Sequence, residues 1–157
     1  MPQQLSDMTD VANWFLNKEP MTHKKLQKLC YYAVAWHYAL YDKTLCRRDE
    51  FQAWVHGPVN ASLYNIYRHC GWNLISLIGT APKFDDEMEM FMETVWNTYG
   101  EFSGHQLEAL THEEEPWVSA RGDLRASDPS SAVISAQSMA KYYISIYDEG
   151  QNDSWKA

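Results

Sequence analysis

His112 is followed by a run of glutamates at residues 113–115, the one constellation in the sequence that suggests catalysis. An imidazole titrates near neutral pH and a neighbouring carboxylate raises its basicity, and these are the ingredients of general acid–base chemistry. The run lacks the His-Glu-x-x-His spacing of zinc proteases. His105 and His112 lie two helical turns apart, too far to share one metal ion without a bend. We therefore predict no metal site. We interpret His112 as the end of a helix, followed by a loop that Trp117 holds against the core.

Other sequence signals of catalysis or cofactor binding are missing. There is no glycine-rich phosphate loop, no nucleophile elbow and no paired set of cysteines. Cys30, Cys46 and Cys70 are odd in number and widely spaced, which fits a reducing cytosol better than a disulfide framework. We predict a cytoplasmic protein without a cofactor, and we do not expect it to be an enzyme.

The Gly57-Pro58-Val59 segment predicts a rigid turn. Proline restricts its predecessor to extended or turn geometry, and Pro58 would suit the first position of a helix. Such a turn can also present a preset backbone to a partner at little cost in entropy. Tryptophans are enriched in binding hot spots, so those on predicted turns, Trp54, Trp72 and Trp117, are candidate interface residues.

Charge argues against general nucleic-acid binding. The formal net charge is −8, whereas phosphate binding depends on clustered Lys and Arg. The one basic cluster is His23, Lys24, Lys25 and Lys28, at the start of a predicted helix, and we interpret it as a solvated helix face. No apolar run is long enough to span a bilayer, so we expect no membrane partner.

Helical periodicity dominates the sequence. We predict a first helix with its N-cap at Asp7, and a central helix over residues 22–41 that is apolar on nearly every side. Phe51 to Val55 permits a short extended segment. Further helices are expected from residue 58 to Gly71, from residues 85–87 to Gly100, and after a capping box of Ser103 and Gln106.

The C-terminal part is predicted to be less regular. Residues 113–131 carry Pro and Gly and are expected to be mostly loop. A last helix begins at Ser135, and its inward-facing residues are predicted to be Met139, Tyr143, Ile146 and Tyr147. The predicted fold is all-α or mostly α: one compact helical domain over residues 1–148 around a central buried helix, with at most a small extended element. Residues 149–157 are predicted to be a flexible tail.

Two segments in this order resemble the Panacea domain, the antitoxin domain also called SocA-like or GepA-like and associated with phages. The first runs from Lys24 through Ala33 and on to Val59. The second runs from Leu110 to Trp117. The resemblance extends from the predicted central helix to about the last one.

The resemblance implies a binding protein. Members of this family neutralise unrelated toxins, usually by direct complex formation, and one branch delivers its toxin to a Clp-type protease. We therefore expect a cognate toxin protein as partner and direct neutralisation as the function. Proteolytic delivery to a Clp-type protease is one alternative, and a small enzyme using His112 and Glu114 is another. The oligomeric state and the identity of the toxin stay open.

The residues that we predict to bind the toxin come from both segments and from the turn after the third helix. They are Trp54, His56, Gly57, Pro58, Val59, Trp72, His112, Glu114 and Trp117.

Overall fold

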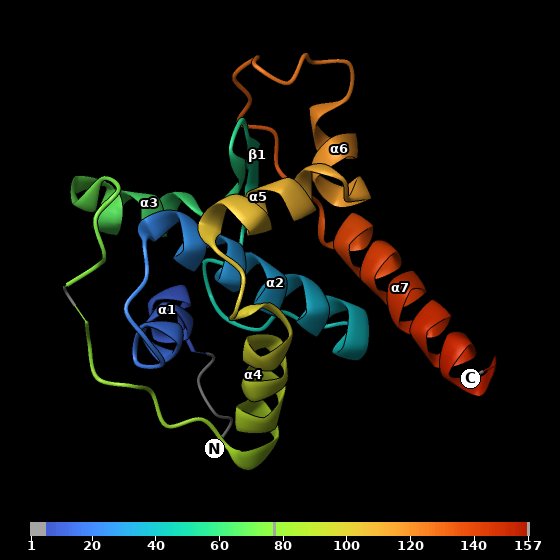
Figure 1. Cartoon of the computed structure of the whole chain (residues 1–157), viewed down its shortest axis with the longest axis horizontal. Helices are drawn as coiled ribbons and strands as arrows, with labels where there is room; N and C mark the ends of the chain where they lie inside the picture. Colours follow the sequence, from blue (N-terminus) through green and yellow to red (C-terminus); the bar gives the residue numbers. More distant parts are fainter. Residues whose placement is uncertain (1–5, 77, 157) are drawn as a thin grey trace.

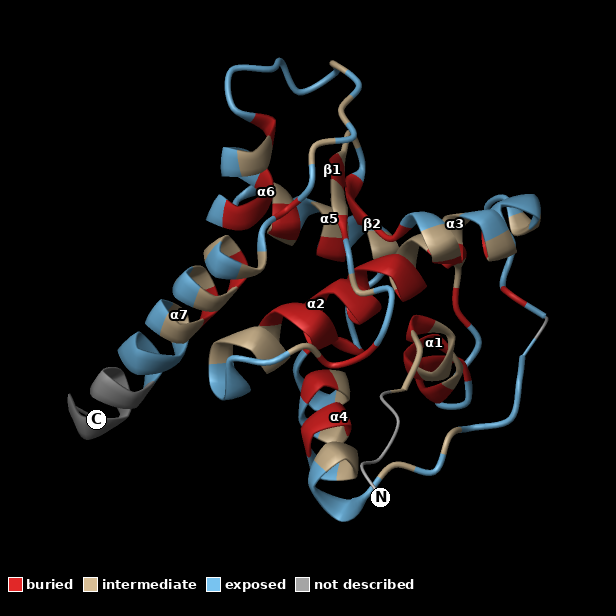
Figure 2. Ribbon diagram, turned by 180° about the vertical axis from the view of Figure 1, so that it is seen from behind, coloured by how far each residue is buried: buried red, intermediate tan, exposed pale blue. Residues whose placement is uncertain are grey.

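Helix α2 (His23–Tyr41) lies at the centre of the molecule, and the other elements pack around it (Figure 1). The computed structural model describes the backbone of residues 6–76 and 78–156, and side chains through residue 150. Thr22 caps α2 as predicted, because its side chain accepts a hydrogen bond from the Lys25 backbone N–H. Every residue of α2 from Leu26 to Ala35 is buried, as Figure 2 shows in red.

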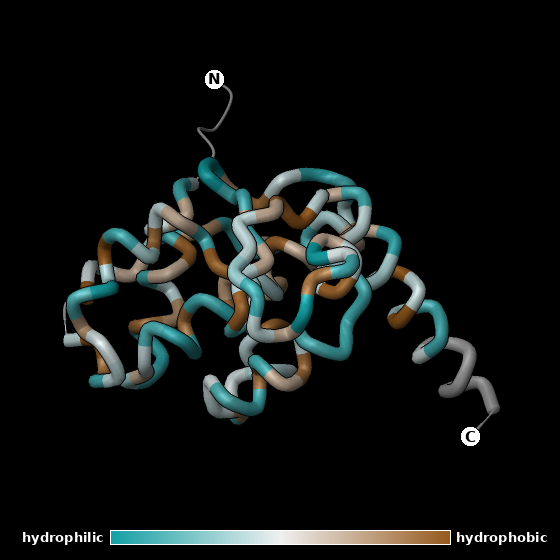
Figure 3. The backbone as a smooth tube through the Cα atoms, turned by 90° about the horizontal axis from the view of Figure 1, so that it is seen from above, coloured by the Kyte–Doolittle hydropathy of each residue, from teal (hydrophilic) through white to brown (hydrophobic). Residues whose placement is uncertain are grey.

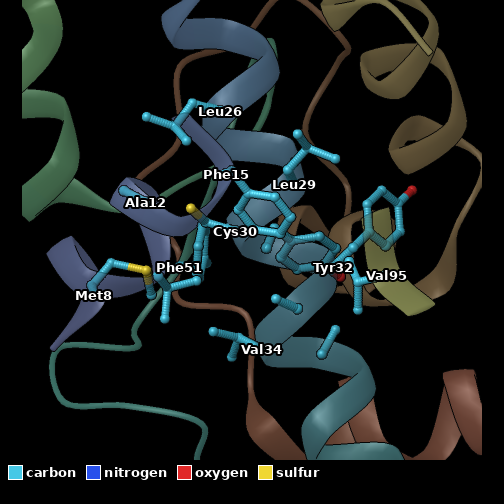
Figure 4. Close-up of a cluster of buried hydrophobic side chains, with 14 of the residues drawn as sticks. Met8, Ala12, Phe15, Leu26, Leu29, Cys30, Tyr32, Val34, Phe51 and Val95 are labelled. Atoms are coloured by element: carbon cyan, nitrogen blue, oxygen red, sulfur yellow. The ribbon is translucent and has the colours of Figure 1, made fainter. Parts of the chain in front are cut away.

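The core forms where α2 meets α1 (Met8–Leu16) and its other neighbours (Figure 4). Phe15 from α1, Cys30 and Leu29 from α2, and Val95 from α4 (Asp86–Tyr99) belong to one buried cluster. The hydropathy colouring in Figure 3 shows apolar and polar residues interspersed along the helices. This pattern is typical of helices that bury one face.

Local capping chemistry sets several helix starts, and the sequence predicts them. The Asp7 side chain caps α1 in a capping box with Asp10. Ser103 and Gln106 form the predicted capping box of α5 (Gly104–His112). Asp85 accepts from the Met88 N–H at the start of α4.

The predicted extended segment is half of an antiparallel hairpin, formed by β1 (Gln52–Trp54) and β2 (Gly57–Val59). Our placement of Pro58 at the first position of a helix is therefore wrong. Pro58 lies in β2 opposite Ala53, whose N–H points away from β2 and donates to the Ala132 carbonyl at 2.8 Å. A residue opposite such a position needs no N–H toward its neighbour, so an edge strand tolerates proline there.

Helix α3 (Ala61–Tyr67) begins after the hairpin with Asn60 as its N-cap. It continues into the short 3-10 helix η1 (Arg68–Cys70), which ends at Gly71 as predicted. The chain then runs to α4 without regular structure over the described residues 71–76 and 78–85.

The expectation of a loop over residues 113–131 is wrong in its first part. Helix α6 (Glu115–Arg121) forms there, with Pro116 in its first turn, where the missing proline N–H costs no helical hydrogen bond. Gly122, at φ 59°, ends it.

The last helix, α7 (Ala136–Lys156), packs along α2. Met139 and Tyr143 are buried as predicted and Ile146 is half-buried, but Tyr147 is exposed, which contradicts its predicted inward position. The helix continues through most of the segment that we predict to be a tail, and the flexibility of residues 149–157 stays a prediction.

The fold class is confirmed: the described chain is mostly helical, surrounds a central buried helix and contains a small two-stranded sheet. No helix in the described residues combines the length and the apolar character needed to cross a bilayer.

Candidate functional site

The two segments that we singled out in the sequence meet in space at the β1–β2 hairpin. Trp117 on α6 donates its indole N–H to the Trp54 carbonyl at 2.8 Å. Arg121, also on α6 and buried, donates to the Ala53 carbonyl at 2.9 Å. Helix α6 therefore holds β1 in place through two side-chain donors.

Gly57 brings the hairpin against α2. Its φ of 108° lies in a region that side chains other than glycine rarely adopt. A Cβ added there would lie 2.6 Å from Cε of Lys28 and 3.1 Å from Oγ1 of Thr111. Only glycine therefore lets the hairpin pass this close to the Lys28 side chain.

Lys28 is a buried base with few partners. The residue is 2% exposed, and its Nζ donates to the Pro58 carbonyl at 3.2 Å. Burial lowers the pKa of Lys28 to about 7, opposed by the charge of Glu108 and reinforced by that of Lys24. This outcome contradicts our interpretation of the basic cluster as a solvated face, because His23 is buried as well.

A cleft of about 380 Å³ opens beside Lys28, between the first turns of α2, the hairpin, α3 and η1. We call it the Trp54–Trp72 cleft. Its lining residues are His23, Lys24, Gln27, Lys28, Trp54, His56, Val59, Tyr64, Arg68, Gly71 and Trp72.

The two tryptophans differ in how firmly they are held. Trp54 is half-buried, packs edge-on against Tyr64 with ring centroids 4.8 Å apart, and donates its indole N–H to Gln52. Trp72 is 74% exposed, and its ring centroid lies 5.6 Å from Nζ of Lys24. A large apolar ring this exposed beside a cleft is the arrangement typical of binding surfaces.

Polar contacts fix the wall formed by α2. Gln27 accepts from the Asn60 N–H at 2.8 Å and donates to the Asn60 carbonyl at 3.2 Å. Its amide nitrogen also lies 3.0 Å from Nε2 of His23. Burial, together with the charge of Lys28, lowers the pKa of His23 to about 4, so this imidazole is neutral and can accept the bond.

Glu108 on α5 contacts two basic side chains at the cleft edge. Its carboxylate lies 3.1 Å from Nζ of Lys24 and 2.9 Å from Nδ1 of His56. Burial works to raise the pKa of Glu108, but the hydrogen bond and charge of Lys24 outweigh it and lower that pKa. Lys24 and His56 therefore already have an acidic partner.

Glu114 precedes the first residue of α6 and is only 6% exposed. Its Oε1 accepts from the hydroxyls of Tyr32 at 2.6 Å and Tyr143 at 2.9 Å. Burial raises the pKa of Glu114, against the opposing effect of these two donors. The carboxylate thus connects the start of α6 with α2 and α7. Glu114 is also the N-cap residue of α6, but its side chain makes no capping hydrogen bond.

His112 stacks on Trp117, with ring centroids 4.0 Å apart and an angle of 16° between the planes. Its buried Nε2 has no hydrogen-bond partner among the described residues. Burial lowers the pKa of His112, although the charge of Glu108 opposes this. The Glu114 carboxylate is engaged with two tyrosines, so the geometry favours a packing role for both residues over the acid–base pair of the enzyme hypothesis.

The structure thus divides the predicted binding residues. Trp54, His56, Val59 and Trp72 line the cleft. The remaining candidates lie beneath the surface or at its edge: Gly57, Pro58, Glu114 and Trp117 are buried and His112 is half-buried. These five residues pack within the hairpin and the helices, and their part in toxin binding stays a prediction.

Sequence reasoning missed Lys28, Gln27, Tyr64 and Arg68 as cleft residues. One signal was available for Lys28, since it lies in a helix predicted to be apolar on nearly every side, which leaves little exposed surface for a charge. Within the described residues, no group of three or more His, Cys, Asp or Glu side chains is arranged to hold a metal ion.

A family model described as the SocA-like antitoxin, Panacea domain, matches residues 26–118, more than half of the chain. The protein belongs to this family. The match covers the cleft residues other than His23 and Lys24, and both landmark segments from Leu26 onward. It ends before α7, so it is narrower than the resemblance we expected. No curated protein and no solved structure gives a significant match.

Proposed function

We propose that this Panacea-domain protein neutralises a cognate toxin protein by direct binding, through the Trp54–Trp72 cleft. Family membership supports an antitoxin role in general. The observation that carries the more specific proposal is the exposed Trp72 at a preformed cleft that Trp54 also lines.

The cleft has the makeup of a binding hot spot. Its floor is fixed by hydrogen bonds between α2 and Asn60, so little order has to be created on binding. Trp54, Tyr64 and Trp72 offer large apolar surfaces, and a few such residues carry most of the affinity in protein interfaces.

The first test is growth rescue and co-purification with the product of the neighbouring reading frame. Rescue, together with a stable complex, supports neutralisation by binding. Rescue that depends on a Clp-type protease and shortens the toxin half-life would instead establish the adaptor alternative. If the product of the neighbouring reading frame is not toxic and forms no complex with this protein, the assumption that this neighbour is the cognate toxin is contradicted.

A matched pair of variants locates the interface. Trp72→Ala should weaken toxin binding at least about thirtyfold, as expected of a hot-spot residue, and leave the thermal unfolding midpoint unchanged. Met90→Ala on α4 removes an apolar side chain of similar exposure, 73% against 74%, and should leave toxin affinity unchanged. A folded Trp72→Ala protein with full affinity would remove the cleft from the interface.

A further inference from the structure

The Trp54–Trp72 cleft has a charge opposite to that of the whole protein. The chain carries a formal net charge of −8. The residues that line the cleft include Lys24, Lys28 and Arg68 and no Asp or Glu. The carboxylate of Glu108 lies at the edge of the cleft, where it contacts Lys24 and His56.

Two of the three cations are available to a ligand. Among the described residues, neither Lys28 nor Arg68 has a carboxylate within salt-bridge distance. The Lys28 ammonium group can donate three hydrogen bonds, and the described residues supply one acceptor, the Pro58 carbonyl. A buried donor group this poorly satisfied gains most from an incoming anion.

The Lys28 ammonium is held in position before any ligand arrives. Gly57 lies against the end of its side chain, the Pro58 carbonyl accepts a hydrogen bond from its Nζ, and burial restricts the stem. Its lowered pKa means that at neutral pH part of the population is neutral, and an anion beside it would draw in a proton. Trp54, Tyr64 and Trp72 also line the cleft, so the parts of the ligand beside its anionic group should be apolar.

We propose that the cleft binds an acidic segment of the toxin in which an Asp or Glu side chain is flanked by apolar residues. Lys28 and Arg68 receive the carboxylate, and Trp54 and Trp72 cover the apolar neighbours. This inference rests on the proposed function, because it names the chemistry by which the same cleft recognises its partner. A protein carboxylate is favoured over nucleic acid, because a net acidic domain repels a long polyanion.

The test uses the full chain alone and a pair of small probes, N-acetyl-Leu-Glu-Leu-amide and its isostere N-acetyl-Leu-Gln-Leu-amide. Binding is followed through the indole N–H signals of Trp54 and Trp72 in proton–nitrogen NMR spectra, assigned with Trp54→Phe and Trp72→Phe. The Glu peptide should shift both signals and bind at least about tenfold more tightly than the Gln peptide. Equal binding of the two peptides, or a stronger response to inorganic phosphate than to the Glu peptide, would overturn the proposal.

Substitutions assign the preference to named groups. Lys28→Met should abolish the discrimination between the Glu and Gln peptides. Arg68→Gln, at an exposed position that folding tolerates, should weaken Glu-peptide binding by about two- to fivefold. Arg47→Gln makes the same change at an exposed arginine outside the cleft and should have no effect. An undiminished preference in Arg68→Gln and in any folded Lys28→Met protein contradicts the assignment.

A pH series adds a readout that a purely structural lysine would not give. Glu-peptide binding should weaken as pH rises through about 7, and Lys28→Met should lose this dependence. The groups around Lys28 are His23 and Lys24 on α2, His56 in the hairpin, Arg68 on η1, and Glu108 and His112 on α5. A pH dependence that persists in Lys28→Met would come from one of the histidines and would count against Lys28.

The peptide assay separates this inference from the proposed function. If the toxin fails to bind while the Glu peptide is still preferred, direct neutralisation is wrong and the carboxylate site stands. If the toxin binds and both Lys28→Met and Arg68→Gln retain full toxin affinity, the function stands and the carboxylate proposal is overturned.

Discussion

Two buried ionisable side chains, Lys28 on the central helix and Glu114, which bonds Tyr32 one turn further along that helix, differ in how many hydrogen bonds the fold gives them. Glu114 accepts two hydroxyl hydrogen bonds from tyrosines on two helices and is enclosed by the aromatic core. Lys28 has one carbonyl acceptor and lines an open cleft. Both charges are costly to bury, but the fold gives the acid two hydrogen-bond donors and the base a single acceptor.

The difference in hydrogen bonding suggests a structural role for Glu114 and a binding role for Lys28. A buried polar group with all its partners stabilises one arrangement of helices, and nothing further can bind it without breaking that arrangement. A buried donor that lacks acceptors and lies beside a cleft can instead form new hydrogen bonds with a ligand. Four substitutions test this contrast, and the largest effect is expected on the Glu114 side.

Glu114→Ala should lower the free energy of unfolding by about 4 kcal/mol, because the Tyr32 and Tyr143 hydroxyls lose their acceptor and a cavity opens. Urea denaturation measures the change. Glu113→Ala removes the same side chain from the adjacent exposed position and should stay within about 0.5 kcal/mol of the wild type. Equal effects of the two substitutions would mean that Glu114 does not join the helices.

Gly57→Ala should cost about 3 kcal/mol on the cleft side, since it combines a strained φ with a clash against Lys28. Gly122→Ala is the control, because Gly122 also has a positive φ but no atom lies within 4 Å of an added Cβ. The difference between the two unfolding free energies isolates the close approach to Lys28. No difference would show that the hairpin shifts freely away from α2.

The pH dependence of stability should reveal the uncompensated charge of Lys28. Its folded pKa of about 7 lies below the ordinary value of 10.5, so between these values the unfolded chain binds more protons than the folded one. The free energy of unfolding must therefore rise with pH in this window. Relative to Lys28→Met, the wild type should gain about 1.6 kcal/mol from about pH 7 to about pH 8.5.

The control for this series is Lys141→Met, which replaces an exposed lysine on α7 and should show no change relative to the wild type over the same pH range. A constant difference between the wild type and Lys28→Met would mean that Lys28 stays fully protonated when buried. Lys28 and Glu114 would then be equally well compensated, and the contrast would fail.

Tyr143→Phe should have the smallest effect, a loss of about 1 kcal/mol, because Glu114 keeps its bond from Tyr32. Tyr142→Phe changes the neighbouring, half-buried tyrosine and should be nearly neutral. Thermal unfolding of the two variants compares them directly, and a larger loss from Tyr142→Phe would contradict the role given to Tyr143.

The sequence by itself determined the elements that depend on neighbours along the chain. The caps at Asp7, Thr22 and Ser103 form within three residues of the groups they bind. The all-round apolar pattern of α2 likewise marked the centre of the fold, because burial of such a helix follows from its composition. Trp54 and Trp72 were recognised as candidates because tryptophan is enriched in binding hot spots.

Only the tertiary structure decided what the ionisable groups do. Glu114 meets Tyr32 across 82 positions of sequence, and Lys28 meets Pro58 across 30. Local patterns read Lys28 as solvated, Pro58 as the start of a helix and residues 115–121 as loop, and all three were wrong. The free energies that settle these positions come from desolvation and long-range hydrogen bonds, which depend on the packed neighbours and not on adjacent residues.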